Sequence, residues 1–86
     1  MKNPIACDLH DYFEIVCMRQ SNIQLTLRNG QKIEGHALDI VTIDKVEFIK
    51  LVTLERQTIE IALTDIQILS AINNEQDEHN FTIQIP

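Results

Sequence analysis

The segment NIQLTLRNGQKIEG, residues 22–35, carries the clearest structural pattern in this chain. Apolar and polar residues alternate from Ile23 to Leu27, which is the period of a half-buried β-strand. The pair Asn29-Gly30 follows, and Asn-Gly tolerates positive φ at both central positions of a tight turn. The segment therefore predicts an antiparallel β-hairpin. Gly35, inside the returning strand, predicts a bulge or a sharp bend.

The same alternation continues on the C-terminal side of this hairpin. The returning strand is predicted from Lys32 to Val41, and further strands are predicted at residues 46–54, 58–63, 66–70 and 81–85. The polar stretch from Asn73 to Asn80 predicts a loop before the last strand. We therefore expect five or six short antiparallel strands.

On the N-terminal side of the hairpin, residues 8–18 have a helical period instead. At about 100° per residue, the apolar side chains of this segment fall on one face of a helix. They are Leu9, Tyr12, Phe13, Val16 and Cys17. The opposite face is acidic, with one exposed aliphatic side chain. It carries Asp8, Asp11, Glu14 and Ile15.

One helix followed by several bent strands predicts a mainly β fold with an N-terminal α-helix. The expected architecture is a small Sm-like barrel or sandwich of five to six antiparallel strands, with the helix packed over the sheet. We expect a single domain over residues 1–86, made of a leader (1–7), the helix (8–18) and the β-barrel or sandwich (22–85). A length of 86 residues suits one domain with a thin core.

The composition limits the classes of partner. Thirteen Asp and Glu against seven Lys and Arg give a formal net charge of −6. Such a surface repels nucleic acid phosphates, so direct RNA or DNA binding is disfavoured, and a basic protein is the expected partner. The chain has no run of 18 apolar residues, which argues against a membrane span. We expect a cytoplasmic protein that is a monomer when free.

The two cysteines and three histidines form no complete metal-binding or catalytic motif in the sequence. If Cys7 and Cys17 lie on one helix, their Cα atoms are roughly 15 Å apart, too far for a disulfide, so both are expected to be free thiols. Cys7 with His10 is the nearest approach to zinc-ligand spacing, and it is incomplete. A convex helix face gives carboxylates no dry pocket for acid–base work. The sequence predicts neither an enzyme nor a cofactor.

The acidic helix face has two readings. Asp8 suits an N-cap and Asp11 suits the first turn, where the helix dipole stabilises negative charge. Helix stabilisation explains neither Glu14 in the second turn nor Ile15 beside it. Carboxylates around an exposed aliphatic residue favour a contact surface for a partner.

The segment PIACDLHDYFEIVC, residues 4–17, resembles the opening signature of the Rho-binding antiterminator family, Rof. The shared pattern is C-D-x2-D-x2-E-x2-C, and looser similarity continues through most of the chain. The resemblance implies an inhibitor of the bacterial transcription terminator Rho. Family members are understood to be Sm-like and to cover the RNA-binding region of the N-terminal OB domain of Rho, which blocks RNA capture and gives antitermination.

The resemblance also implies the contact residues. Asp8, Asp11 and Glu14 match the helix carboxylates of the family, and Ile15 lies beside them. From the loop after the second strand only Lys45 can be carried over, because Ile43-Asp44-Lys45 stands where relatives carry more basic and polar residues. Two alternatives remain open: an Sm-like RNA-binding module, and an acidic adaptor of another basic protein.

Overall fold

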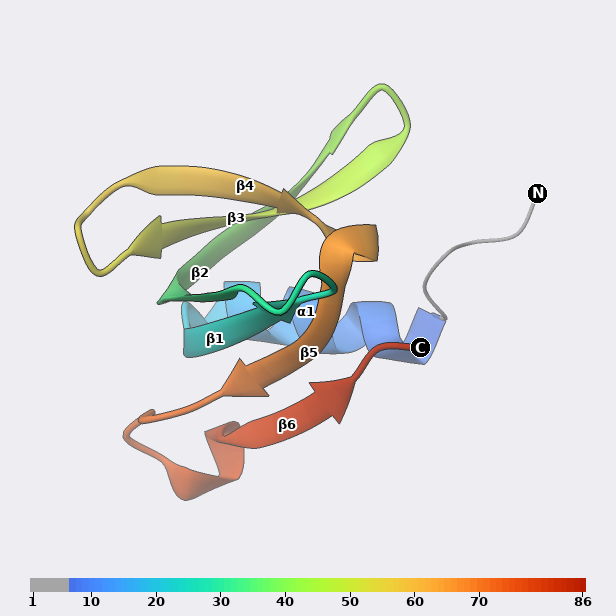
Figure 1. The fold of residues 1–86 in the computed structure, drawn as a ribbon. Helices are drawn as coiled ribbons and strands as arrows, with labels where there is room; N and C mark the ends of the chain where they lie inside the picture. Colours follow the sequence, from blue (N-terminus) through green and yellow to red (C-terminus); the bar gives the residue numbers. More distant parts are fainter. Residues whose placement is uncertain (1–6) are drawn as a thin grey trace.

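The computed structural model describes residues 7–86, with side chains from Leu9 onward. The predicted leader, apart from the backbone of Cys7, and the side chain of Asp8 lie outside the described part. The described chain forms one α-helix, six strands and two short 3-10 helices (Figure 1). In order these are α1 (Cys7–Arg19), β1 (Asn22–Leu27), β2 (Lys32–Ile43), β3 (Val46–Thr53), β4 (Thr58–Ala62), η1 (Leu63–Asp65), β5 (Ile66–Ala71), η2 (Asp77–His79) and β6 (Phe81–Gln84).

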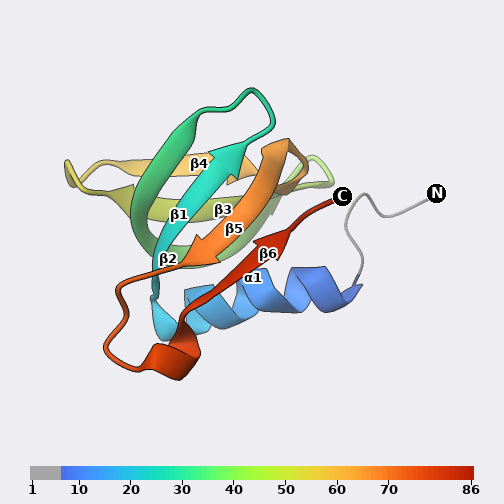
Figure 2. The ribbon, with the colours of Figure 1, turned by 60° about the horizontal axis from the view of Figure 1, so that its bottom comes forward.

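All neighbouring strands pair antiparallel, in the order β4-β3-β2-β1-β5-β6. Figure 2 shows the strongly curved sheet with α1 along one side of it. The predicted mainly β class with an N-terminal helix is therefore confirmed. The helix begins one residue before and ends one residue after the expected 8–18.

Helix α1 ends in a backbone motif that turns the chain into β1. Gln20 has a positive φ of 51°, and its N–H donates to the carbonyl of Cys17 at 3.1 Å. The N–H of Ser21 donates to the carbonyl of Val16 at 2.9 Å. This pair of bonds is the Schellman motif, which satisfies carbonyls that the helix leaves unpaired. The helix therefore stops at Arg19 and the first strand can start at Asn22.

The hairpin predicted from Asn29-Gly30 is present, but its turn differs from the expected two-residue form. Gly30 alone in this turn has a positive φ, +89°, and its N–H donates to the carbonyl of Leu27 at 2.9 Å. Leu27 N–H in turn donates to the carbonyl of Gln31 at 2.8 Å. The connection is thus a three-residue loop with glycine at its left-handed position, which is the next commonest hairpin geometry.

A two-residue turn of the expected kind occurs one hairpin later. Ile43 of β2 pairs with Val46 of β3, and the two residues between them, Asp44 and Lys45, have φ of 50° and 68°. Positive φ at both positions is the type I′ geometry, which matches the twist of the flanking strands. Strand β2 therefore extends to Ile43, two residues beyond the prediction.

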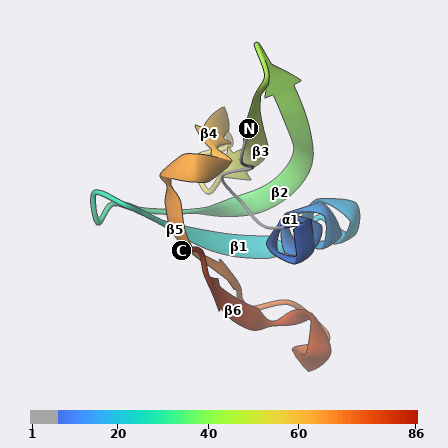
Figure 3. The same cartoon turned by 90° about the vertical axis from the view of Figure 1, so that its right-hand side faces the viewer.

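Strand β2 bends sharply so that one strand serves both halves of the sheet, as Figure 3 shows. It pairs with β1 up to His36 and with β3 from Gly35 onward. A Cβ at Gly35 would lie 2.1 Å from the carbonyl oxygen of Val52, so only glycine allows this close approach. Gly35 thus lies where β2 pairs with both β1 and β3, and the register shift of a bulge lies between Ala37 and Asp39.

The core brings buried residues of α1 together with those of β1, β2, β3 and β5. Phe13 and Val16 are fully buried and Cys17 is 8% exposed, so the middle of the predicted apolar helix face is confirmed. Tyr12 was predicted on the same face but is 37% exposed, with its ring 5.3 Å from that of Phe81 at the edge of the sheet. The alternation of buried residues in β1 and β5 supplies most of the sheet side of this core.

The polar stretch predicted as a loop is tied to the sheet. Asn74 accepts a hydrogen bond from the backbone N–H of Asn22 at 2.8 Å and donates to the side chain of Asn80 at 2.9 Å. The short helix η2 occupies part of the stretch. Within residues 7–86 no helix is long and apolar enough to cross a membrane.

Candidate functional site

The acidic face of α1 is exposed where its side chains are described. Asp11 and Glu14 are exposed, and Ile15 beside them is half-buried instead of fully exposed as predicted. The side chain of Asp8, the remaining predicted carboxylate, lies outside the described side chains. Because Phe13 and Val16 anchor the opposite face in the core, the acidic face is held outward by the packing of the helix.

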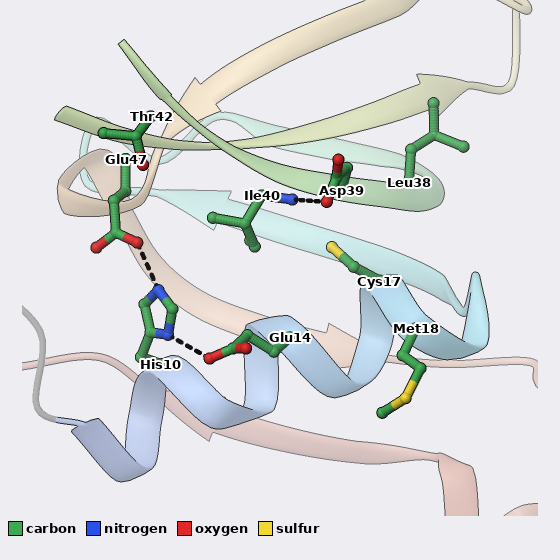
Figure 4. A pocket seen from close by; sticks show the side chains of 9 residues that line it. All are labelled: His10, Glu14, Cys17, Met18, Leu38, Asp39, Ile40, Thr42 and Glu47. Atoms are coloured by element: carbon green, nitrogen blue, oxygen red, sulfur yellow. Dashed lines mark hydrogen bonds and ion pairs between the residues drawn. The ribbon is translucent and has the colours of Figure 1, made fainter. Parts of the chain in front are cut away.

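His10 connects this helix to the β2–β3 hairpin. Its Nδ1 lies 2.8 Å from Oε1 of Glu14, one helical turn on, and its Nε2 lies 2.6 Å from Oε2 of Glu47 on β3. Figure 4 shows the imidazole ring between the two carboxylates. The His10 side chain is 25% exposed, and those of Glu14 and Glu47 are 56% and 44% exposed. We call this arrangement the His10 bridge.

The His10 bridge shifts the proton affinity of the imidazole. Partial burial by itself lowers the pKa of His10, but the hydrogen bonds and negative charges of Glu47 and Glu14 outweigh burial and raise the pKa above its ordinary value of 6.5. Both ring nitrogens face carboxylate oxygens, which are acceptors only. The geometry is therefore that of the imidazolium form, with two N–H donors.

A groove of about 440 Å³ lies between α1 and the hairpin, next to the His10 bridge (Figure 4). Its charged lining besides His10 consists of Glu14, Asp39 and Glu47, one from each of α1, β2 and β3. Leu38, Ile40 and Met18 are among its apolar lining. The groove is thus acidic at its rim and partly apolar inside.

Cys17 also lines this groove but is not reactive. Burial raises the pKa of its thiol to about 12, and the charges of Asp39 and Glu14 act in the same direction. The thiolate is the nucleophile and the metal ligand, so at neutral pH Cys17 is an inert part of the core. The prediction of a free thiol is confirmed for Cys17. Cys7, the other predicted thiol, has no described side chain.

One group in the described part of the chain brings possible metal ligands together. The ligand atoms of His10, Asp11 and Glu14 lie within 4.8 Å of one another. Both nitrogens of His10 are already hydrogen-bonded to carboxylates, and the two remaining groups are exposed. Exposed carboxylates on one helix turn are expected for a solvated face, so we assign no metal to them. The approach of Cys7 to His10 lies outside the described side chains.

Lys45, predicted from the loop after the second strand, stands at the tip of the β2–β3 hairpin. It is exposed, in the type I′ turn. Glu47, two residues further along the chain, reaches the helix through the His10 bridge. The structure thus connects the hairpin that bears Lys45 to the helix that bears Glu14.

Sequence reasoning missed His10 and Glu47 as members of this site. The spacing of His10 and Glu14, four residues apart, was a readable signal, since such positions are neighbours on a helix. No sequence signal pointed to Glu47, because it is 37 residues from His10 and its position depends on how β2 bends.

Comparison with known proteins agrees with this fold. The model of a family described as "Modulator of Rho-dependent transcription termination (ROF)" matches residues 4–82. The proteins named Protein rof from Escherichia coli strain K12 and from Shigella flexneri are each 33% identical to this chain over 67 residues, which cover 78% of this chain and 79% of theirs.

A solved structure is similar as well. It is that of YaeO bound to magnesium, from Vibrio cholerae O395, with a TM-score of 0.73 and 25% identity. The similarity covers 86% of this chain and 94% of that one. The family match spans the helix, the bent hairpins and the start of β6, which are the elements that build the acidic face and the groove. The chain belongs to the ROF family of modulators of Rho-dependent transcription termination.

Proposed function

We propose that this protein inhibits the transcription terminator Rho by binding the RNA-binding OB region of Rho through the acidic face of α1. Blocking capture of the nascent transcript then gives antitermination. The partner-binding residues that we assign are Asp8, Asp11, Glu14, Ile15 and Lys45. The protein acts as a monomer in the cytoplasm, where Rho meets its transcripts, and no catalytic step or cofactor is involved.

The observation that carries this proposal is the pair of exposed carboxylates on a rigidly packed helix. Asp11 and Glu14 are exposed on α1, whose other face is anchored by Phe13 and Val16. An OB groove for single-stranded RNA is basic and tracks the phosphate backbone. An acidic helix offers such a groove negative charges without the loss of freedom that an RNA strand undergoes on binding. Family membership supports Rho as the owner of that groove.

The net charge argues in the same direction. The chain carries a formal charge of −6, which disfavours binding to RNA itself and favours a basic protein surface. A gel shift with oligo-U should accordingly show no complex with this protein alone. A complex would favour the alternative of an Sm-like RNA-binding module.

The decisive experiment is the double variant Asp11→Lys/Glu14→Lys. We expect it to lose binding to Rho, with at least about a hundredfold weaker affinity, because close charge pairs across an interface couple by about 1.5 kcal/mol or more each. It should also fail to relieve Rho-dependent termination in vitro. Circular dichroism checks that the fold is unchanged.

The matched control is Glu55→Lys/Glu75→Lys. Both glutamates are exposed and lie outside α1 and the β2–β3 hairpin, and the change in net charge is the same. This control should bind Rho with nearly wild-type affinity. Unchanged binding in the helix variant, or equal loss in both variants, would exclude the acidic helix face as the contact. If every variant binds Rho, but this protein and RNA do not compete for Rho, the contact lies elsewhere on Rho.

A further inference from the structure

The His10 bridge joins two elements that each bear a proposed contact residue. Helix α1 carries Glu14, and the β2–β3 hairpin carries Lys45 at its tip. The hairpin projects from the body of the sheet, with its tip pointing away from the helix, as Figures 1 and 3 show. Its links to the helix include the contact between Glu47 and His10. The orientation of the hairpin relative to the helix therefore depends in part on one side chain.

The His10 bridge needs a proton on each ring nitrogen of His10. A neutral imidazole has one N–H and one lone pair, so it can donate to only one of two carboxylates. In this structure both ring nitrogens are within 2.8 Å of carboxylate oxygens. Loss of one proton places a nitrogen lone pair against a carboxylate oxygen, and one of the two contacts must open.

The charge state of the groove beside the His10 bridge is set by the protonation of His10. The carboxylates that lie near it or line its groove are Asp11 and Glu14 from α1, Asp39 from β2 and Glu47 from β3. Cys17 lines the same groove but stays neutral, because burial raises its pKa. Among the described residues that line the groove, His10 is the one that can carry a positive charge. Its deprotonation leaves a groove lined by three carboxylates with no positive charge among its lining residues.

We propose that His10 is a positioning residue: in its protonated form it fastens the β2–β3 hairpin to helix α1 and so fixes the relative orientation in which the partner meets the two elements. The fastening itself is a property of the free protein. Its consequence for binding rests on the proposed function. Glu14 and Glu47 are both about half exposed, and ion pairs at such positions add little to global stability, so the bridge acts mainly on orientation.

The fastening is tested on the free protein by NMR titration of the histidine side chains. We expect the pKa of His10 to lie above the ordinary value, and both Glu47→Gln and Glu14→Gln to lower it. Signals of His36 and His79 in the same spectra are the internal control. Backbone shifts of residues 40–48 should change together with the His10 titration in the wild type and not in Glu47→Gln. A His10 pKa at the ordinary value, unchanged by either variant, would overturn the proposal.

The consequence for binding is tested by measuring Rho affinity between pH 6 and pH 9 for three proteins. Wild-type affinity should fall about three- to fivefold as the pH rises through the His10 pKa. His10→Gln should be weakened to a similar extent at pH 6, and its difference from the wild type should vanish at pH 9. His10→Arg keeps donors for two carboxylates at every pH, so it should bind tightly and lose the pH dependence that His10 causes.

The pH response of Rho itself is common to all three proteins, so the differences between them isolate His10. Identical pH profiles in the wild type, His10→Gln and His10→Arg would overturn the role of the bridge in binding. The single variant Asp11→Lys, which leaves both carboxylates of the His10 bridge in place, separates this failure from failure of the proposed function. Should that variant bind Rho like the wild type, the contact face is wrong, and the NMR titration still decides whether His10 fastens the hairpin.

Discussion

Gly35 lets the backbone of β3 approach β2 closely. A Cβ there would meet the carbonyl oxygen of Val52 at 2.1 Å, and a backbone oxygen cannot swing aside as a flexible side chain can. We expect Gly35→Ala to lower the free energy of unfolding by about 2–4 kcal/mol, because β3 must move away from β2. Urea unfolding followed by circular dichroism measures the change.

Gly30 provides the control for this prediction. Its φ of +89° is unusual for an L-residue, unlike that of Gly35, but a Cβ there would meet nothing within 4 Å. Gly30→Ala should therefore cost only the left-handed backbone conformation, about 1–2 kcal/mol. Equal losses in the two variants would mean that contact with Val52 is not what requires glycine at position 35.

The contribution of His10 to stability should depend on pH. Its pKa is raised in the folded protein, so its contribution is fully present below the unfolded pKa, about 6.5, and is lost as the pH rises through the folded pKa. Partly exposed pairs contribute little, so we expect the wild type to exceed His10→Gln by about 0.5–1 kcal/mol near pH 5.5 and by nothing near pH 9. Thermal unfolding of both proteins across this range checks the sign. A difference that grows with pH would contradict it.

The sequence predicted which side chains of α1 are exposed or buried, and it missed the contact between α1 and β3. The 3.6-residue period was enough to place Asp11 and Glu14 outside and Phe13, Val16 and Cys17 inside. It erred on Tyr12, since this amphipathic ring at the edge of the core packs at a tilt against Phe81 and stays partly exposed. The partner of His10 on β3 depends on tertiary packing, which no local period contains.

At the scale of elements, the β2–β3 turn stores backbone strain. Asp tolerates a left-handed conformation, but Lys45 with φ of 68° does not do so readily. We expect Lys45→Gly to raise the free energy of unfolding by about 0.5–1 kcal/mol. Lys45→Gln removes the charge and keeps the Cβ, so it should leave stability nearly unchanged. If the free energy of unfolding rises in both variants, the gain comes from removal of the charge and not from relief of strain.

The same pair of variants tests Lys45 as a contact residue. Both remove the ammonium group, so both should weaken Rho binding to the same extent if that group contacts the partner. Binding retained in Lys45→Gly and Lys45→Gln would remove Lys45 from the proposed contact surface while leaving the acidic helix face untouched.

The elements themselves were predictable where a local signal existed. Alternation and Asn29-Gly30 predicted β1 and its return, and the helical period predicted α1 to within one residue at each end. The turn at Asp44-Lys45 was not recognised as a tight turn, because the pair lacks the glycine that marks type I′ geometry in a sequence. The extension of β2 to Ile43 was missed for the same reason.

At the scale of the whole molecule, the order β4-β3-β2-β1-β5-β6 combines two kinds of pairing. The pairs from β1 to β4 and the pair of β5 with β6 join consecutive strands, which sequence reasoning expects by default. The pairing of β1 with β5 joins residues 39 to 48 positions apart and is selected by the shared core through Leu25 and Leu69. The bent, mainly β class could be predicted, but the sheet order depends on that long-range pairing, and the groove depends on how β2 and β3 pack beside α1.

The net charge of the molecule and the local charge of α1 make different predictions for salt dependence. Wild-type binding to Rho should weaken at least about tenfold between low and high ionic strength, mainly through the association rate, because salt screens the attraction between an acidic protein and a basic groove.

Asp11→Lys/Glu14→Lys and Glu55→Lys/Glu75→Lys each raise the formal net charge from −6 to −2. If overall charge steers the encounter, both variants flatten the salt dependence equally. If the acidic face of α1 does so, as we propose, the second variant keeps a salt slope close to that of the wild type and the first loses it. Stopped-flow association rates at a series of salt concentrations distinguish the two, and an equally flat slope in both variants would contradict local recognition by the helix.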